Sequence, residues 1–431
     1  MSNLNNNLSQ NDIPDTWSRI PLYEFRNKND RYGFTGGPFG SDLKSEHYTQ
    51  SGVKILQLQN IGEGKFIDKG IVYTSEEKAN ELISCNIYPD EIILAKMAPV
   101  ARCCKVPSTD ERYVMCSDGI RLSVDTNKYD NDFVFQALNS KYFRDEAESK
   151  STGTTRARIG LNELKQICLA VPNSLPEQQK IAKILSAVDD KIEVIDQQII
   201  ETQALKKGLM QRLLTKGIGH TEFKDSPLGM IPKSWEVVTI NEIAEVKGGK
   251  RLPKGEALIE NKTEHPYIRV TDMFMGGVSL EKILYVPDNI FPVISRYTIS
   301  KDDLFISVAG TLGIVGEVPF ELDGANLTEN ADKLTNIKVN KSFLLQLLLS
   351  PFIQDLVQKE QTNNAQPKLA LTRIKEFIIP KPPKEEQEKI ASILRTVDNK
   401  LEVLLEKKTH YQELKQGLMQ QLLTGRIRVT I

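Results

Sequence analysis

Apolar residues near the middle of the chain recur at alternating spacings of four and three, the pattern of a heptad seam. The seam positions are Ile181, Leu185, Val188, Ile192, Ile195 and Ile199. Such a stripe predicts a long helix that packs against another helix. The same rhythm returns near the C-terminus at Ile390, Leu394, Val397, Leu401 and Leu404. Lys408 interrupts this second seam, as Thr202 interrupts the first, and a shifted register resumes at Leu414, Leu418 and Leu422.

The two helical stretches are copies of one sequence. Gln387 follows Gln178, and Asp398 follows Asp189, at the same offset of 209 residues. Two matching seams in one chain most simply pair with each other, and the globular stretch between them favours an antiparallel arrangement. A helix of about 38 residues, at ~1.5 Å rise per residue, is roughly 57 Å long. Along B-DNA that length corresponds to on the order of 15 base pairs.

The stretches outside the helices are also related. Short β-branched and aromatic runs alternate there with Gly and Pro turns, which predicts mainly β domains with a few helices. Ile231-Pro232-Lys233-Ser234-Trp235 restarts the second domain as Ile13-Pro14-Asp15-Thr16-Trp17 starts the first, and later segments correspond at an offset of 212.

The sequence therefore predicts an α+β fold. Two mixed, mainly β domains are separated by two long helices that form an antiparallel coiled coil with pseudo-two-fold symmetry. The predicted parts are a disordered N-terminus at 1–12, a first domain at 13–175, a first helix at 176–216, a second domain at 217–382, and a second helix with a C-terminal tail at 383–431.

Composition narrows the function classes. The chain of 431 residues is 40% apolar and 26% charged, which is typical of a soluble protein with several domains. Its net charge of −1 means that any nucleic-acid site must rest on local positive charge. The apolar run 343–353 is too short to span a bilayer, so we expect a cytoplasmic protein. Five cysteines without a CxxC pair indicate reduced, packed thiols and no metal site.

No enzyme signature was found in the sequence. It lacks a phosphate-binding P-loop, a methyl-donor motif, an HExxH motif and a Ser/His/Asp arrangement above chance. Polar groups of the first domain are also not kept in the second, where Val308, Ile314 and Gly316 stand opposite Lys96, Arg102 and Cys104. Different surfaces on a shared frame favour two different recognition tasks.

The order of these motifs resembles the DNA-specificity (S) subunit of type I restriction-modification enzymes. The resemblance rests on the helix starts LPEQQKIAKIL and KEEQEKIASIL, the helix ends LKxGLMQxLLT and the re-entry GMIPKSWE. It implies that each domain is a target-recognition domain that reads one half of a bipartite, asymmetric site on double-stranded DNA. It also implies that the helices set the gap and dock two methyltransferase (M) subunits, to which motor-nuclease (R) subunits attach. The chain would then be non-catalytic and hold no cofactor, because methyl donor, ATP and Mg would bind to the partner subunits.

Three segments of the first domain are candidates for DNA contact. Glycines in GGPFGSDLK let backbone N–H groups approach a phosphate, and SKSTGTTRARIGLN carries cations and hydroxyls without an acid. The polar run QLQN alternates with apolar residues on a probable strand, where strand-face solubility is the competing interpretation. The candidate residues are Gly36, Gly37, Ser41, Lys44, Gln57, Gln59, Asn60, Lys150, Thr154, Thr155, Arg156 and Arg158.

Corresponding segments of the second domain supply the other candidates. KGGKRLPK places four cations in eight residues, and QTNNAQPK is rich in amides, which can pair bidentately with adenine. The candidates are Lys247, Lys250, Arg251, Lys254, Arg269, Thr271, Asn363, Asn364, Gln366 and Lys368.

Polar residues and glycines kept in both helices indicate a common partner surface, because a coiled-coil seam alone explains only the kept apolar positions. The glycines cost about 1 kcal/mol each in a helix, which suggests close approach by another helix. These candidates are Gln178, Lys180, Asp189, Lys206, Gly208, Gln387, Lys389, Asp398, Lys415 and Gly417. The alternatives are a purely structural coiled coil and, for the whole chain, a coiled-coil protein-binding scaffold without DNA specificity.

Overall fold

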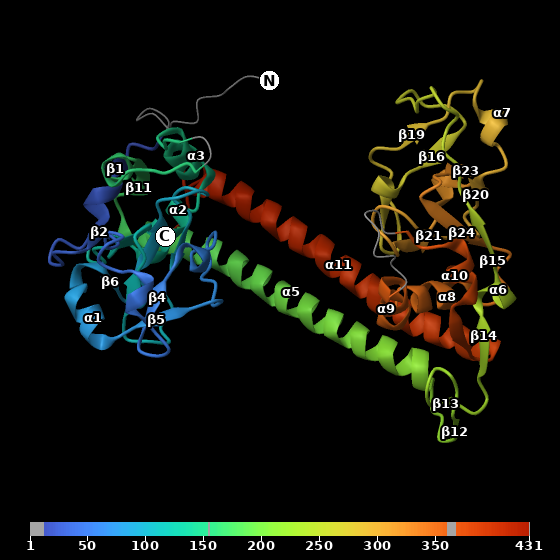
Figure 1. Cartoon of the computed structure of the whole chain (residues 1–431). Helices are drawn as coiled ribbons and strands as arrows, with labels where there is room; N and C mark the ends of the chain where they lie inside the picture. Colours follow the sequence, from blue (N-terminus) through green and yellow to red (C-terminus); the bar gives the residue numbers. More distant parts are fainter. Residues whose placement is uncertain (1–12, 154–155, 360–367, 431) are drawn as a thin grey trace. The chain divides into compact units, whose positions relative to one another are not determined.

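A computed structural model describes residues 13–153, 156–359 and 368–430 (Figure 1). The chain divides into two compact units: unit 1 is 1–196 with 406–431, and unit 2 is 197–405. Two long helices contribute to both units, α5 (Leu175–Lys216) and α11 (Lys384–Leu422). They cover 42 and 39 residues, so the predicted long helices are present.

Within the described residues, the globular part of unit 1 contains three sheets and four shorter α-helices. One sheet has the order β2 (Phe34–Gly36), β10 (Gly119–Leu122), β7 (Ile92–Ala95), β8 (Cys103–Lys105). A second has the order β3 (Tyr48–Thr49), β5 (Val72–Thr74), β4 (Val53–Leu56), β9 (Tyr113–Met115), β6 (Asn86–Ile87). The third pairs β1 (Trp17–Pro21) with β11 (Cys168–Pro172). The helices are α1 (Glu76–Glu81), α2 (Asn131–Leu138), α3 (Lys141–Ser149) and α4 (Leu161–Lys165).

Unit 2 is built in the same order. Its first sheet is β15 (Glu245–Gly248), β24 (Ala331–Thr335), β21 (Leu304–Ser307), β22 (Val315–Glu317). Its second is β19 (Leu284–Tyr285), β16 (Pro266–Ile268), β23 (Ala325–Leu327), β20 (Thr298–Ile299). Three strand pairs follow, β14 (Glu236–Thr239) with β25 (Ile378–Lys381), β12 (Phe223–Lys224) with β13 (Ile231–Pro232), and β17 (Met273–Phe274) with β18 (Gly277–Val278). Its shorter helices are α6 (Ile240–Ile243), α7 (Phe291–Ile294), α8 (Lys341–Leu348), α9 (Pro351–Lys359) and α10 (Leu371–Glu376).

The strand registers confirm that the two globular parts share one frame. Gly36 pairs with Ile120 in unit 1, and Gly248 pairs with Asp332 in unit 2, so both partners shift by 212 residues. The parallel pair β4–β9 corresponds in the same way to β16–β23. The predicted α+β class, with two mixed, mainly β domains and two long helices, is therefore confirmed.

The helical seams belong partly to the globular cores. Ile181 and Leu185 join the main core of unit 1 with Leu422, and Ile390 and Leu394 join that of unit 2. Farther along α5, Val188, Ile195 and Ile199 are 8%, 7% and 8% exposed, as a helix–helix seam requires. The prediction that the apolar seam of α11 resumes is only partly correct, because Leu414 is 48% exposed whereas Leu422 is 4% exposed.

Ion pairs fix the direction of the helices within each unit. In unit 1, Asp189 pairs with Lys415 and Asp196 with Lys408, both at 2.6 Å. Seven residues forward on α5 thus match seven residues back on α11, so these segments run antiparallel. In unit 2, Lys206 pairs with Asp398 at 2.6 Å, and twelve residues later the Ile218 N–H donates to the Glu386 carboxylate.

A tryptophan anchors each globular part to the start of a long helix. Trp17 and Trp235 are 1% and 0% exposed, and each indole N–H donates to a glutamate, Glu177 at 3.3 Å and Glu386 at 2.8 Å. Arg428 also binds Glu177, with its Nε 2.7 Å from the Glu177 Oε1. The repeated Ile-Pro-x-Ser/Thr-Trp motif is therefore a docking contact between a sheet and a helix.

Candidate nucleic-acid interface

The glycine pairs at the ends of β2 and β15 are needed because the neighbouring chain lies very close. A Cβ at Gly37 would lie 1.8 Å from the Cys116 carbonyl oxygen, and one at Gly249 would lie 2.0 Å from that of Thr328. A side chain is excluded at either position without movement of the backbone. Both glycines thus hold the following loop against the turn between two core strands.

Three segments of unit 1 meet beside Gly36. The Lys96 ammonium donates to the Ser117 carbonyl oxygen at 2.9 Å, and the Lys96 carbonyl accepts from the Ile159 N–H at 2.9 Å. Arg158 pairs with Asp118 at 2.8 Å. Burial and the positive charge of Arg158 lower the pKa of Lys96. The predicted glycine loop and the end of the Thr-rich loop are therefore neighbours, and Lys96, absent from the predicted site, lies between them.

The same segments meet in unit 2. The Lys250 N–H donates to the Leu327 carbonyl at 2.8 Å, and Lys368 forms a β-bridge with Ala309, the equivalent of the bridge between Arg158 and Met97. The other predicted cations surround this point with exposed side chains, although Lys247 pairs with Glu245 and Arg251 with Glu329. Lys254 is exposed farther along the loop.

The outer part of the glycine loop in unit 1 presents an aromatic ring. Phe39 is 82% exposed, and Ser41 and Lys44 beside it are also exposed. An exposed aromatic ring beside cations suits apolar contact with a thymine methyl group in the major groove of a duplex. Sequence reasoning selected the glycines and Lys44 but missed Phe39, because a single Phe carries no periodic signal.

The predicted strand at QLQN is wrong. β4 ends at Leu56, and residues 58–60 form a 3-10 turn. Asn60 is 0% exposed and donates to the Ile67 and Lys69 carbonyls, while its Oδ1 accepts from the Gln57 N–H at 2.9 Å. Asn60 therefore closes a turn and cannot read a base from this position.

The equivalent turn of unit 2 uses an acid in the same way. The Asp272 carboxylate accepts from the Arg269 N–H at 2.9 Å and from its guanidinium at 2.7 Å. This arrangement engages Arg269 inside the chain. Thr271 and Gln59 are the exposed members of the two turns.

The structure describes some of the remaining loop candidates and leaves others outside its described residues. Arg156 is exposed, and Lys150 lies at the end of α3, where it pairs with Glu146 at 3.3 Å. Thr154, Thr155, Asn363, Asn364 and Gln366 lie outside the described residues.

Two of the predicted partner-facing residues are wrong. Gln178 and Gln387 are 1% and 2% exposed. Gln178 accepts from the Asp130 N–H at 2.8 Å and donates to the Pro172 carbonyl at 2.9 Å, and Gln387 makes the equivalent bonds to Asn340 and Pro382. Their amides join sheet and helix inside each unit, which is why both copies have a glutamine there.

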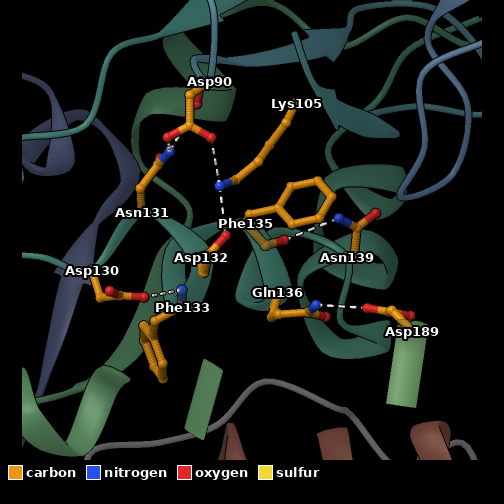
Figure 2. A network of polar contacts seen from close by, with 10 residues as sticks. All are labelled: Asp90, Lys105, Asp130, Asn131, Asp132, Phe133, Phe135, Gln136, Asn139 and Asp189. Atoms are coloured by element: carbon orange, nitrogen blue, oxygen red, sulfur yellow. Dashed lines mark hydrogen bonds and ion pairs between the residues drawn. The ribbon is translucent and has the colours of Figure 1, made fainter. Parts of the chain in front are cut away.

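Asp189 belongs to a polar network that also holds α2 in place (Figure 2). Gln136 donates to the Asp189 carboxylate at 2.8 Å, as Gln346 does to Asp398 in unit 2. At the other end of α2, Lys105 pairs with Asp90 at 2.8 Å and Asp132 at 2.5 Å (Figure 2). Lys206 pairs with Asp398, and Lys415 pairs with Asp189. These four predicted partner-facing residues therefore already have partners within the chain.

The other predicted partner-facing residues lie on the helix surface. Lys180 and Lys389 are exposed, and a Cβ at Gly208 or Gly417 would meet no atom within 4 Å. A cavity adjoins each of these helix segments, of about 310 Å³ next to Lys207 in unit 2 and about 620 Å³ next to Gln416 in unit 1. Both cavities have equivalent linings, which include Met210, Gln211, Thr215, Ser350 and Phe352 in one and Met419, Gln420, Thr424, Ser140 and Tyr142 in the other.

Three of the five cysteines, Cys85, Cys103 and Cys104, are buried. All five thiols are free, and burial raises the pKa of Cys104 to about 12. The described residues contain no cluster of three or more His, Cys, Asp or Glu side chains suited to a metal ion. In the same residues, no helix combines the length and apolar character needed to cross a membrane.

Comparison with known proteins identifies the family. The sequence model of the protein family named type I restriction modification DNA specificity domain matches residues 45–203 and 232–416 of the chain. The chain belongs to this family, and it is a type I restriction-modification specificity subunit.

Individual relatives agree with this result over most of their length. The chain is 28% identical to the type I restriction enzyme MjaVIII specificity subunit of Methanocaldococcus jannaschii, over 73% of this chain and 75% of the relative. It is 20% identical to the type I restriction enzyme EcoBI specificity subunit of Escherichia coli, over 90% and 80%. The crystal structure of a type I S subunit from M. genitalium has the same fold, with a TM-score of 0.58 at 18% identity over 99% of both chains.

Proposed function

We propose that the chain is a non-catalytic recognition subunit that reads a bipartite, asymmetric site on double-stranded DNA. Each globular part reads one half-site, and the two helices set the distance between the halves and dock two M subunits. Methyl transfer, ATP hydrolysis and cleavage belong to the M and R subunits, which bind the methyl donor, ATP and Mg.

The observation that carries this proposal is a repeated frame with unlike surfaces. Gly37 and Gly249 hold equivalent loops, and Arg158 and Lys368 lie at equivalent bridges. Other positions around them differ, as with Lys96 against Val308. Repeated cations suit phosphate contacts, which fix position, whereas differing side chains suit base contacts, which specify sequence.

The partner surface is supported by the helix residues that remain exposed. Gly208 and Gly417 leave room for a partner's backbone, and the cavities lined by their neighbours Lys207 and Gln416 offer two equivalent places for a partner's side chain. The near-zero net charge of the chain predicts weak DNA affinity until M subunits add their own contacts.

Exchange of one globular part tests the proposal. Residues 13–175 are replaced by the matching domain of a relative, and methylated sites are mapped after assembly with M subunits. We expect one half-site to change and the other half-site and the gap to stay. A change in both half-sites would contradict independent reading.

A gel shift with random duplex pools, with and without M subunits, distinguishes this function from that of a protein-binding scaffold. A scaffold would select no sequence in either condition. Matched removal of 197–203 and 401–407 then tests the spacer role, because it keeps the antiparallel pairing while shortening both helices by seven residues. At ~1.5 Å per residue and ~3.4 Å per base pair, the gap should shorten by about three base pairs with both half-sites kept.

A further inference from the structure

The space beside the equivalent glycines of β2 and β15 holds opposite charges in the two units. A Cβ built at Gly36 would lie 2.7 Å from the Lys96 Nζ. A Cβ built at Gly248, which is the equivalent position, would lie 3.3 Å from the Asp332 Oδ1. An ammonium and a carboxylate therefore occupy the same place in the shared frame.

The two charged residues do not stand at equivalent positions of the repeated sequence. Lys96 corresponds to Val308, which is 3% exposed in the core of unit 2, and Asp332 corresponds to Ile120, which is 0% exposed in the core of unit 1. Lys96 directly follows β7, whereas Asp332 lies on β24. Each unit has an apolar residue where the other has its charged one.

Asp332 is unusual as a structural residue. It is 5% exposed, and its Oδ2 has no hydrogen-bond partner among the described residues. An unpaired buried carboxylate costs stability, so a core selected only for packing would not keep it. Lys368 and Lys375 are the cations whose charge acts on this carboxylate. Lys368 also ends the amide-rich loop of the candidate site.

We infer that Lys96 and Asp332 are specificity-determining residues, one for each half-site, and that their opposite charges select bases of opposite hydrogen-bonding character. This inference rests on the proposed function. A base edge over Gly36 meets an ammonium, which favours guanine with its O6 and N7 acceptors. A base edge over Gly248 lies near the Asp332 Oδ1, and a carboxylate oxygen there favours the amino group of cytosine or adenine. Both charges lie at the edge of an apolar core, where charge acts more strongly than in water.

The test neutralises each charge with little change of size, in Lys96→Met and Asp332→Asn, in the full chain assembled with its M subunits. Methylated sites are mapped across a genomic DNA sample, and the preference at every position is counted. We expect Lys96→Met to lower discrimination about tenfold at one position of one half-site. We expect Asp332→Asn to do so in the other half-site, with the opposite base character. Matched controls are Lys233→Met and Asp323→Asn, which neutralise charges outside the site and should keep the wild-type motif.

The outcomes separate this inference from the proposed function. If the wild-type complex methylates no bipartite motif, the proposed function fails. If the wild-type motif is bipartite and both variants keep full discrimination, the inference is overturned while the function stands. Should either variant fail to fold, Lys96→Gln and Asp332→Leu provide second neutral forms. Lys96→Arg and Asp332→Glu keep the charge and should keep the character of the preferred base, which a purely structural role does not require.

Discussion

Neutralising Asp332 should stabilise unit 2 at neutral pH. Burial raises the pKa of this carboxyl group from its usual 3.8 to about 6, and its Oδ2 has no hydrogen-bond partner among the described residues. Asp332→Asn keeps the shape of the side chain and removes its ionised form. Asp332→Leu removes the polar group as well and introduces the apolar character that Ile120 has at the equivalent position of unit 1.

The sign of the pH dependence follows from the raised pKa. The folded state holds its proton up to about pH 6, whereas the unfolded chain releases it near pH 3.8. The free energy of unfolding therefore falls as pH rises through this interval, and the full penalty is present above pH 6. The difference between a pKa of 3.8 and one of about 6 corresponds to a loss of on the order of 3 kcal/mol in the free energy of unfolding. Because the amide of Asn must itself stay buried, we expect Asp332→Asn to regain ~1–3 kcal/mol at pH 8.

The two tryptophans allow this to be measured in the intact chain. Trp17 lies in unit 1 and Trp235 in unit 2, and the chain has no others. Incorporation of 5-fluorotryptophan gives one ¹⁹F signal for each, so urea unfolding of each unit can be followed separately at pH 8 and at pH 3.5. The Trp235 transition should move to higher urea at pH 8 in both variants, and the Trp17 transition should stay.

Two results would refute the reasoning. An unchanged Trp235 transition at pH 8 in both variants would mean that the carboxylate carries no penalty. An equal gain at pH 8 and pH 3.5 would mean that packing, and not ionisation, is the cause, because Asp332 is already protonated at the lower pH. Asp323→Asn is the control, since Asp323 lies at the surface with a lowered pKa.

Three further changes test other parts of the structure. Phe39→Ala should lower the affinity of the assembled complex for duplex DNA about tenfold in a gel shift, through loss of an apolar contact in the groove. The Trp17 transition should stay unchanged, because the ring is 82% exposed. Equal affinity would exclude a DNA contact by this ring. Glu386→Gln weakens charged hydrogen bonds to Trp235 and His220 and should destabilise unit 2 by ~1–3 kcal/mol in the same urea assay, whereas Glu385→Gln, at an exposed neighbour, should not. Cys103 and Cys104, both 0% exposed, should resist a thiol reagent at pH 8 until unit 1 unfolds, as peptide mass spectrometry would show; rapid native labelling would contradict their packing.

The internal repeat made much of the fold predictable. An offset of 212 residues located the equivalent sheets, and an offset of 209 located the helices, since both follow from one duplicated chain. The repeat did not reveal which kept residues face inward. Gln178 was predicted to face a partner because it is kept in both helix copies off the apolar seam, yet it accepts from the Asp130 N–H, 48 residues earlier. Such a contact leaves no periodic trace in the sequence.

The sequence could predict only those parts of the candidate site whose residues cluster within one segment. Glycine and cation clusters identified the loops. Asp332, in contrast, has the pattern of an exposed polar residue in a half-buried strand, and nothing in the sequence beside it marks a site. Asp332 lies opposite Gly248 in the pairing of β24 with β15, although the two residues are more than eighty positions apart in sequence. A pattern within one segment cannot show that a charge on one strand meets a glycine on another.

Each long helix supplies carboxylates that accept hydrogen bonds from side chains of the globular part. Asp189 and Asp398 accept from Gln136 and Gln346, and Glu177 and Glu386 accept from the two tryptophans. A domain introduced by exchange must therefore supply a tryptophan near its start and a glutamine on the helix equivalent to α2, whatever DNA it reads. An exchange that lacks the glutamine leaves the partly buried aspartate without this hydrogen bond, at a cost of ~1–3 kcal/mol. Restoring that one residue should recover stability without altering the half-site, because Gln136 lies at the helix and not at the glycine loop.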